Sequence, residues 1–303
     1  MFIIQNRKIF YVLSVILVAL SLGALLIFGL RFGIDFKGGS LLEFDYAQSR
    51  PDITSVRTEL GEMRAIEGYS IRPTGELGFI LRTPYIDETT HADLVAVLSH
   101  KGAISLKEKR FDSVGPSLGS ELQSKALLSL GLVIFAIVCF ITFAFRKVSQ
   151  PVSSWKYGII AIVALLHDVL IPTGAFAILG HFAGFEIDAL FVTALLVILG
   201  FSIHDTIVVF DRVRENLRRN NESRRTEVFE ETVGKSLSQT FARSINTSLT
   251  TVLALLALYF LGSEATTHFA LALLIGITAG TYSSLFIGTP LLVTVEKWQH
   301  RSS

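Results

Sequence analysis

The sequence has 303 residues, of which 50% are hydrophobic, with a formal net charge of +1 and a mean hydropathy of +0.54. This composition is too apolar for an ordinary soluble domain, and the near-neutral charge gives no sign of a nucleic-acid partner. The sequence has a single cysteine, Cys139, which excludes an intrachain disulfide and a thiolate metal site. It lies in an apolar run and is interpreted as a small buried hydrophobe.

Six apolar stretches are long enough to cross a bilayer, which takes about 20 residues of helix. The first is interpreted as an uncleaved span, because its apolar run reaches Leu30 and no Ala-x-Ala cleavage site follows. The predicted spans are 9–28, 126–145, 157–180, 187–210, 244–262 and 269–295.

The charges between these spans indicate their orientation, since Lys and Arg favour cytoplasmic loops. Both termini and the loops at 146–156 and 211–235 are basic, whereas the links at 181–186 and 263–268 carry no Lys or Arg. The termini are therefore predicted to be cytoplasmic. The basic residues of the two loops are Arg146, Lys147, Lys156, Arg212, Arg214, Arg218, Arg219, Arg224, Arg225 and Lys235. The expected parts are the N-terminus with the first helix at 1–30, an extracytoplasmic domain at 31–123, and five further helices at 124–303.

The arginines of 211–235 are interleaved with glutamates, as in a solvated cytoplasmic loop, so we expect no nucleic-acid partner there.

Segment 31–123 has the pattern of a small folded domain. Strands are expected at 40–46, 69–72, 79–82 and 103–111, and helices at 51–60 and 87–100. The order β-α-β-β-α-β is that of the ferredoxin-like unit. The sequence thus predicts an α-helical polytopic membrane protein with six transmembrane helices and a small α/β (ferredoxin-like) extracytoplasmic domain. This domain shows no metal-ligand or catalytic cluster.

A glycine-rich segment joins the first span to this domain. It contains Gly33, Asp35, Gly38 and Gly39, and glycine permits a tight backbone path that other residues resist. The segment lacks the Gly-Lys-Ser/Thr sequence of a phosphate-binding loop, so we interpret it as a structural junction.

Two lone charges stand out within the apolar spans. Asp205 is the only Asp, Glu, Lys or Arg between Asp188 and Asp211, and Arg243 is the only one between residues 236 and 262. At 1.5 Å per residue, the two lie roughly 9 and 12 Å from the charged ends of their spans. Charges inside a membrane are costly and mark ion or proton pathways or partner contacts. Asp205 and Arg243 are therefore candidate partners or members of one network, either for proton coupling or for locking two helices together.

Polar residues accompany each of these charges at helical spacing. Ser202 and Thr206 share a face with Asp205, while Asn246, Thr247 and Thr250 share a face with Arg243.

A further carboxylate, Asp168, lies in the third span. Pro172, four residues on, removes the backbone donor that would bond to the Asp168 carbonyl. Asp168 is either a hydrogen-bonding group in helix packing or a second proton site. In the sixth span, small residues at i+4 intervals predict close approach of another helix, namely Gly276, Gly280, Ser284 and Gly288.

Four segments together, 33–39, 166–169, 200–216 and 242–248, resemble SecF, a family of membrane subunits of the bacterial Sec protein-export machinery. The resemblance covers nearly the whole chain, with the motifs in matching order. The family's intramembrane Asp and Arg correspond to Asp205 and Arg243, with Thr247 on the same face. At His204, where we would expect Asn, the sequence departs from the family. The histidine either replaces the hydrogen bonds of Asn or titrates near neutral pH.

The resemblance implies a multi-pass protein of the bacterial inner membrane that pairs with SecD. Together they would use the proton motive force to promote export through the SecYEG channel, with YajC as a further companion. The unfolded exported polypeptide would be met on the outer side, and the family Arg is thought to face a carboxylate supplied by SecD. No cofactor or metal is implied.

Two other functions are weighed against this interpretation. A stand-alone proton-coupled efflux or lipid transporter of the same superfamily would have to oligomerise, because only one six-span half is present. An intramembrane hydrolase built on Ser202, His204 and Asp205 is disfavoured, because residues at i and i+2 do not share a helix face and no hydrolase motif accompanies them.

Overall fold

The computed structural model describes residues 2–145, 153–223 and 227–301. The chain divides into two compact units, one made of Met1–Arg31 with Leu128–Ser303 and the other of Phe32–Leu127. Each is described by itself.

The first unit is helical and contains the membrane-crossing segments. Within the described residues, six helical segments are long and apolar enough to span a bilayer, and each predicted span overlaps one of them. The helices of this unit are α1 (Phe2–Gln5), α2 (Arg7–Phe28), α6 (Pro116–Ala144, which begins in the second unit), α7 (Ser154–Phe182), α8 (Ala189–Glu222), α9 (Phe229–Leu261), α10 (Glu264–Ser283) and α11 (Thr289–Arg301). A π-helical turn, η2 (Ser284–Gly288), joins α10 to α11.

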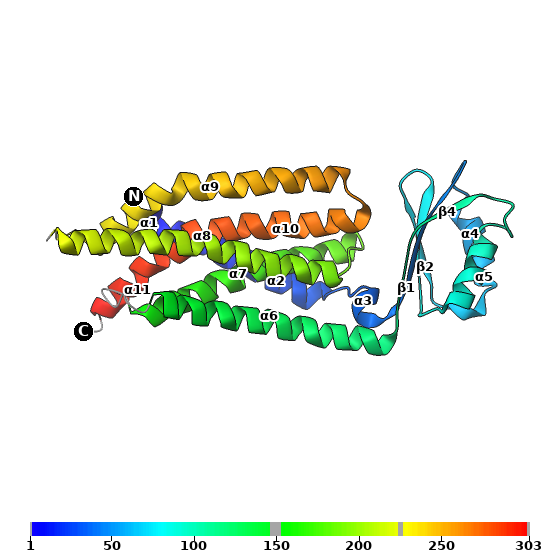
Figure 1. Cartoon of the computed structure of the whole chain (residues 1–303), viewed down its shortest axis with the longest axis horizontal. Helices are drawn as coiled ribbons and strands as arrows, with labels where there is room; N and C mark the ends of the chain where they lie inside the picture. The colour runs from blue at the N-terminus through cyan, green and yellow to red at the C-terminus, as the bar shows by residue number, and fades with distance from the viewer. Residues whose placement is uncertain (1, 146–152, 224–226, 302–303) are drawn as a thin grey trace. The chain divides into compact units, whose positions relative to one another are not determined.

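Helices α7, α8 and α10 form the centre of this bundle, where α10 packs on α7, α8 and α9, and α2 packs on α7 (Figure 1). Small residues permit the close contacts. A Cβ atom added at Gly174 of α7 would lie 2.5 Å from the Ser21 Cα of α2, and one at Gly280 would lie 3.0 Å from the Ser202 Cβ. The predicted small-residue ridge of the sixth span thus packs on α8.

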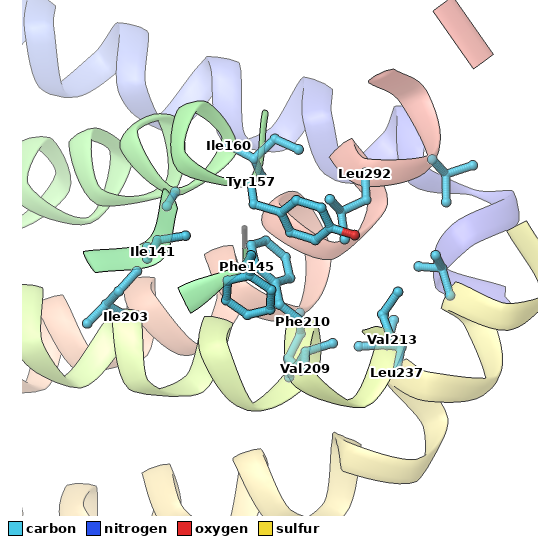
Figure 2. Close-up of a cluster of buried hydrophobic side chains, with 14 of the residues drawn as sticks. Ile141, Phe145, Tyr157, Ile160, Ile203, Val209, Phe210, Val213, Leu237 and Leu292 are labelled. Atoms are coloured by element: carbon cyan, nitrogen blue, oxygen red, sulfur yellow. The ribbon is translucent and has the colours of Figure 1, made fainter. Parts of the chain in front are cut away.

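One end of the bundle is held by an apolar cluster. The rings of Phe145 and Tyr157 stack at 5.2 Å, and Phe210 of α8 packs edge-on against both (Figure 2). Val213 and Leu237 extend the cluster onto α8 and α9. Aromatic pairs of this geometry contribute about 0.5–1.5 kcal/mol each.

The segment 211–235, expected as a loop, is mostly helical. Helix α8 continues to Glu222, and α9 begins at Phe229. Ion pairs one turn apart stabilise the extension, among them Arg219–Glu215 at 2.6 Å and Arg218–Glu222 at 2.8 Å. Apolar residues at helical spacing, Phe210, Val213 and Leu217, also hold the extension against the core. Arg146, Lys147, Arg224 and Arg225 of the predicted loops lie outside the described residues.

Cys139 corrects one expectation, because it is exposed on α6 and not buried. This helix packs little of its apolar span against the rest of the chain, and Leu127, Leu128 and Phe135 also face outward. In a membrane such a face contacts lipid or another protein, so an apolar run there does not predict burial inside the chain.

The second unit has the predicted ferredoxin-like topology, with the strand order β2-β3-β1-β4 and all neighbours antiparallel. Its two longer helices lie on one face of the sheet (Figure 1). Alternate residues Leu42, Phe44 and Tyr46 of β1 are buried in the core with Phe79 and Leu81 of β3. The elements are α3 (Ile34–Lys37), β1 (Gly39–Tyr46), α4 (Ile53–Gly61), η1 (Arg64–Ile66), β2 (Ser70–Thr74), β3 (Gly78–Thr83), α5 (Glu88–Leu98) and β4 (Leu106–Val114).

The glycine-rich segment forms a tight crossing inside this second unit. Gly33 caps the short helix α3, which contains Asp35. Gly38 and Gly39 have φ angles of 77° and 130°, which L side chains rarely adopt. A Cβ atom at Gly38 would lie 2.8 Å from the Pro116 Cα, so the backbone passes directly against the start of α6.

Candidate functional site

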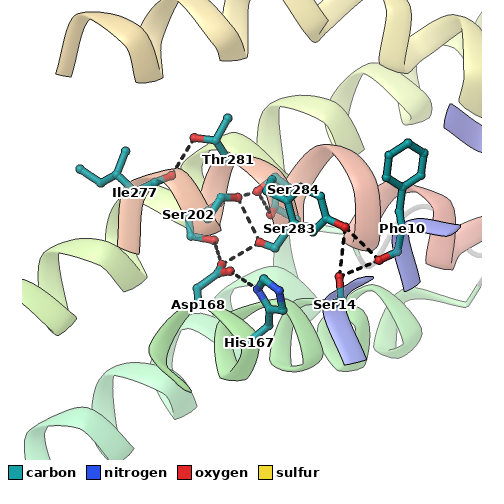
Figure 3. A network of polar contacts seen from close by, with 12 residues as sticks. Phe10, Ser14, His167, Asp168, Ser202, Ile277, Thr281, Ser283 and Ser284 are labelled. Carbon is teal, nitrogen blue, oxygen red and sulfur yellow. Dashed lines mark hydrogen bonds and ion pairs between the residues drawn. The ribbon is translucent and has the colours of Figure 1, made fainter. Parts of the chain in front are cut away.

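The densest polar site in the bundle surrounds Asp168, which is fully buried in α7. Its Oδ2 atom accepts hydrogen bonds from the hydroxyls of Ser202 on α8 and Ser283 on α10, the latter at 2.8 Å (Figure 3). Its Oδ1 atom lies 2.9 Å from Nδ1 of His167. Asp168 therefore joins the three central helices through hydrogen bonds to a single carboxyl group.

The positions of these donors follow from the helices that carry them. Gly280 lets α10 approach Ser202, which brings Ser283, one turn on, within reach of Asp168. The π-helical turn follows Ser283 directly, and such turns are often found at functional sites. Pro172 lies inside α7, which continues as one helix from Ser154 to Phe182.

Two more hydroxyls extend this site along α8. Ser284 Oγ donates to the backbone carbonyl of Ser202 at 3.2 Å, and it shares a second hydrogen bond of 2.8 Å with the hydroxyl of Thr206. Because the Ser284 proton is used in the first bond, Thr206 is the donor in the second. The chain of hydroxyls thus reaches the helical turn that carries Asp205.

Asp205 is also buried, with 3% of its surface exposed, but it is poorly satisfied. Its Oδ2 atom has no hydrogen-bond partner within the described residues. Ser248 of α9 is a hydrogen-bonding neighbour of the carboxyl group, and the His204 and Arg243 side chains are also nearby. The described side chains of Asp205 and Arg243 form no ion pair, so the two lone charges are near each other without direct contact.

Arg243 lies instead on an exposed face of α9. Asn246, Thr247 and Thr250 are exposed on the same face, as the helical spacing predicts. The Thr247 hydroxyl is satisfied locally, because it donates to the Arg243 carbonyl at 2.9 Å. We call Arg243, Asn246, Thr247 and Thr250 the α9 polar face, a group of polar side chains within an apolar span that no other part of the described chain covers.

The site residues named from the sequence therefore fall into two groups. Asp168 and Ser202 come together in one buried site, with Asp205 one turn beyond Ser202, whereas Arg243, Asn246 and Thr247 lie on the surface of the chain. Asp35 and the junction glycines belong to the other unit.

Sequence reasoning missed His167, Ser283 and Ser248 as members of these sites. Ser244 and Ser248 are buried on the opposite side of α9 from Arg243, and Ser248 shares a 2.6 Å hydrogen bond with Thr281 of α10. Four-residue spacing of small hydroxyls on α9 was the available signal. Among the described residues, no three His, Cys, Asp or Glu side chains are grouped as metal ligands would be.

Comparisons with known proteins identify the family. The model of the protein export membrane protein SecD/SecF C-terminal region matches residues 94–298, and that of the SecD/SecF GG motif matches residues 23–49. The chain is 46% identical to the protein translocase subunit SecF of Thermobaculum terrenum, over 97% of this chain and 93% of that one. It is 38% identical to SecF of Anaerolinea thermophila, over 99% of this chain and 96% of that one.

A solved structure matches over almost the whole chain. The crystal structure of SecDF from Thermus thermophilus, described as a translocon-associated membrane protein, superposes with a TM-score of 0.81 at 30% identity. The match covers 97% of this chain and 38% of that larger protein. The resemblance read from the motifs is therefore confirmed, and the chain belongs to the SecD/SecF family of protein-export membrane proteins.

Proposed function

We propose that this chain is an accessory subunit of the Sec protein translocase that works with SecD and uses the proton motive force to promote export through the SecYEG channel. Family membership supports the role in export. The observation that supports proton coupling is the exposed α9 polar face, with Arg243 at its centre and the poorly satisfied carboxyl group of Asp205 nearby.

An arginine facing lipid in mid-span is costly, by about 3 kcal/mol or more. Arg243 would be stabilised if a partner supplied a carboxylate against the α9 polar face. SecD is the partner that we propose, because the homologous solved structure is named SecDF and this chain matches only 38% of it. YajC and the lipids of the inner membrane are further proposed contacts.

Proton coupling would follow from the movement of Arg243 relative to Asp205. A nearby positive charge stabilises the ionised form of a carboxyl group, and burial without one favours the protonated form. If the partner helices carry Arg243 away, Asp205 takes up a proton, and when Arg243 returns the proton leaves. Each charge moved across the membrane supplies about 2.3 kcal/mol per 100 mV, which is enough to shift an equilibrium between two conformations.

The proposed orientation puts both termini in the cytoplasm and the ferredoxin-like unit outside, where it would meet the unfolded exported polypeptide. Ion pairs support a common side for the termini. Arg7 at the start of α2 contacts Glu230 at 2.8 Å, and Lys297 of α11 contacts the same carboxylate. The starts of α2 and α9 and the α11 segment that carries Lys297 therefore lie at one end of the bundle.

The test replaces the two charges in membrane vesicles that contain the whole translocase. Asp205→Asn keeps the size of the side chain and removes its titration, and Arg243→Met removes the charge. We expect both variants to abolish the part of export that depends on the proton gradient while the complex still assembles. Leu249→Ala, an exposed apolar change on α9, is the matched control. Wild-type gradient-dependent export in either charge variant would contradict the proposal, and a homo-oligomer with no companions would favour a stand-alone transporter.

A further inference from the structure

We propose that His167 and Asp168 form a second proton-holding pair, in which His167 takes up and releases the proton and Asp168 passes the change in charge to α8 and α10. The inference rests on the proposed function, since the proton would serve the same export cycle. It concerns a histidine that the proposed function does not use.

The geometry of the pair is that of a carboxylate and an imidazole sharing a hydrogen bond in a closed site. His167 is 5% exposed and Asp168 is not exposed at all. Nδ1 of His167 lies 2.9 Å from Oδ1 of Asp168, and the remaining oxygen, Oδ2, accepts from Ser202 and Ser283. Nε2 of His167, by contrast, has no hydrogen-bond partner among the described residues.

This arrangement leaves one atom free for loading. In the empty pair, His167 is neutral, Nδ1–H donates to Asp168, and the pair carries the single negative charge of the carboxylate. A proton taken from water binds to Nε2 and makes the pair neutral overall. Release of the same proton from Nε2 restores the negative charge, and no other bond forms or breaks in the cycle.

Within the described residues, no positively charged side chain of a neighbouring element lies beside the pair to take the place of this proton. The titratable side chains near the pair there are Tyr282 of α10, whose ring stacks on His167 at 6.0 Å, Tyr11 of α2, and Asp205 one turn beyond Ser202 on α8. The net charge of the pair therefore changes when a proton binds. Because the site has a low dielectric constant, this change alters the strength of the hydrogen bonds that the pair makes.

His167 also lines a cavity of about 570 Å³ between α2, α7 and the η2–α11 segment. The lining is mostly apolar, with the hydroxyls of Tyr11 and Ser14 as polar groups beside His167. Ser14 lies 3.3 Å from the Tyr282 hydroxyl, which donates to the Phe10 carbonyl at 2.9 Å. His167 thus borders a space that Asp205 does not line.

The two serines convert the charge of the pair into a link between helices. Hydrogen bonds to an ionised carboxylate are roughly twice as strong as those to a neutral group. Asp168 stays ionised in both states, but in the loaded pair the imidazolium of His167 draws part of its negative charge away from Ser202 and Ser283. These two hydrogen bonds therefore hold α8 and α10 to α7 more firmly when the pair is empty than when it is loaded. The π-helical turn after Ser283 gives α10 a place where such a change can be absorbed.

The first experiment reads the histidine directly. The whole chain, purified with its companions and placed in lipid, carries ¹⁵N-labelled histidine, and His167→Asn identifies the His167 signal among the seven histidines. We expect that signal to change between its neutral and protonated forms within about pH 5 to 8, and Asp168→Asn to alter this change. A His167 signal that stays constant over this range, or one that titrates identically in Asp168→Asn, overturns the proposal.

The second experiment asks whether that proton serves export. His167→Asn keeps a donor toward Asp168 and removes titration, so a purely structural role would survive it. We expect at least about a fivefold loss of gradient-dependent export and a flattened pH profile, with gradient-independent export unchanged. The matched control is His181→Asn, an exposed histidine on the same helix. A wild-type pH profile in His167→Asn refutes the role of His167, whereas the effect of Asp205→Asn tests the proposed function separately.

Discussion

Two polar regions of the same bundle differ in whether this chain itself supplies hydrogen-bond partners for their polar groups. Around Asp168, each oxygen of a buried carboxyl group has a partner, and the donors come from α7, α8 and α10 of this chain. On the α9 polar face, Arg243 and Asn246 are exposed among apolar neighbours. The first site is complete within one chain, whereas the second needs a group from outside it.

This difference predicts that the first region stabilises the isolated chain and that the second stabilises the complex with a partner. A satisfied buried network holds the helices of one chain in a single arrangement, so its loss should be felt by the isolated protein. An unsatisfied charge on a lipid-facing surface stabilises nothing until a partner arrives, so its loss should be felt by the complex. Four pairs of variants follow. Three of them test this separation, and one tests the packing of the central helices.

The largest difference is expected between Asp168→Leu and Arg243→Leu. Removing the Asp168 carboxyl group leaves His167 and Ser202 without this acceptor and Ser283 with only the Gly280 carbonyl. Breaking a buried network of this kind costs about 3–5 kcal/mol. Arg243→Leu should leave the isolated chain as stable as before. Thermal unfolding of the purified chain in detergent measures both, and equal losses would remove the distinction between the two regions.

A smaller difference is expected between two hydroxyl changes. Ser283→Ala removes one donor to a charged oxygen, worth about 1.5–3 kcal/mol. Thr247→Val removes a hydroxyl that bonds only to its own helix at the described positions, so its effect on the isolated chain should be near zero. Denaturant unfolding of variants with equal m-values measures the loss of unfolding free energy in each. A loss in Thr247→Val as large as that in Ser283→Ala would contradict the difference between the two regions.

The glycines of the central helices provide a third pair. Gly280→Ala places a Cβ atom 3.0 Å from the Ser202 Cβ, which should cost about 1–3 kcal/mol by overpacking. Gly200→Ala on α8 meets nothing within 4 Å and should be neutral or slightly stabilising. Hydrogen exchange of α8 and α10 locates the loss, and similar protection in both variants would show that the close approach is not needed.

The smallest effect concerns the hydroxyls that extend the Asp168 site toward Asp205. A double-mutant cycle of Thr206→Val and Ser284→Ala should give a coupling of about 0.6 kcal/mol, the average for hydrogen bonds between membrane helices. The same cycle for Thr247 and Ser284, which belong to different regions, should give none. A coupling energy between Thr247 and Ser284 as large as that between Thr206 and Ser284 would show that the two regions are not independent.

Much of this architecture could be predicted from the sequence. Hydrophobic length identified the six spans, and alternation identified the ferredoxin-like order of strands and helices. Helical spacing placed Arg243, Asn246 and Thr247 on one face correctly. These features depend on local periodicity, which one sequence contains.

The contacts between helices could not be read in the same way. Which helix Asp168 faces depends on the packing of α7 against α8 and α10, and periodicity within one helix does not specify its neighbour. His167 illustrates the limit, because side chains of consecutive helix residues do not normally face each other. The sequence therefore does not reveal that Nδ1 of His167 lies 2.9 Å from Oδ1 of Asp168. Cys139 illustrates another, since an apolar run in a membrane protein can face lipid or a partner and not the core of its own chain.

The most direct test is a cross-link from the α9 polar face. Thr247→Cys is made in a background that carries Cys139→Ser, and the complex is oxidised in native membranes against single cysteines in the helices of SecD. We expect the thiol introduced by Thr247→Cys to form a disulfide with one SecD helix and to be protected from a lipid-soluble thiol reagent in the complex. An introduced thiol that forms no cross-link and reacts equally fast in the complex and in the isolated chain would show that no partner covers Arg243.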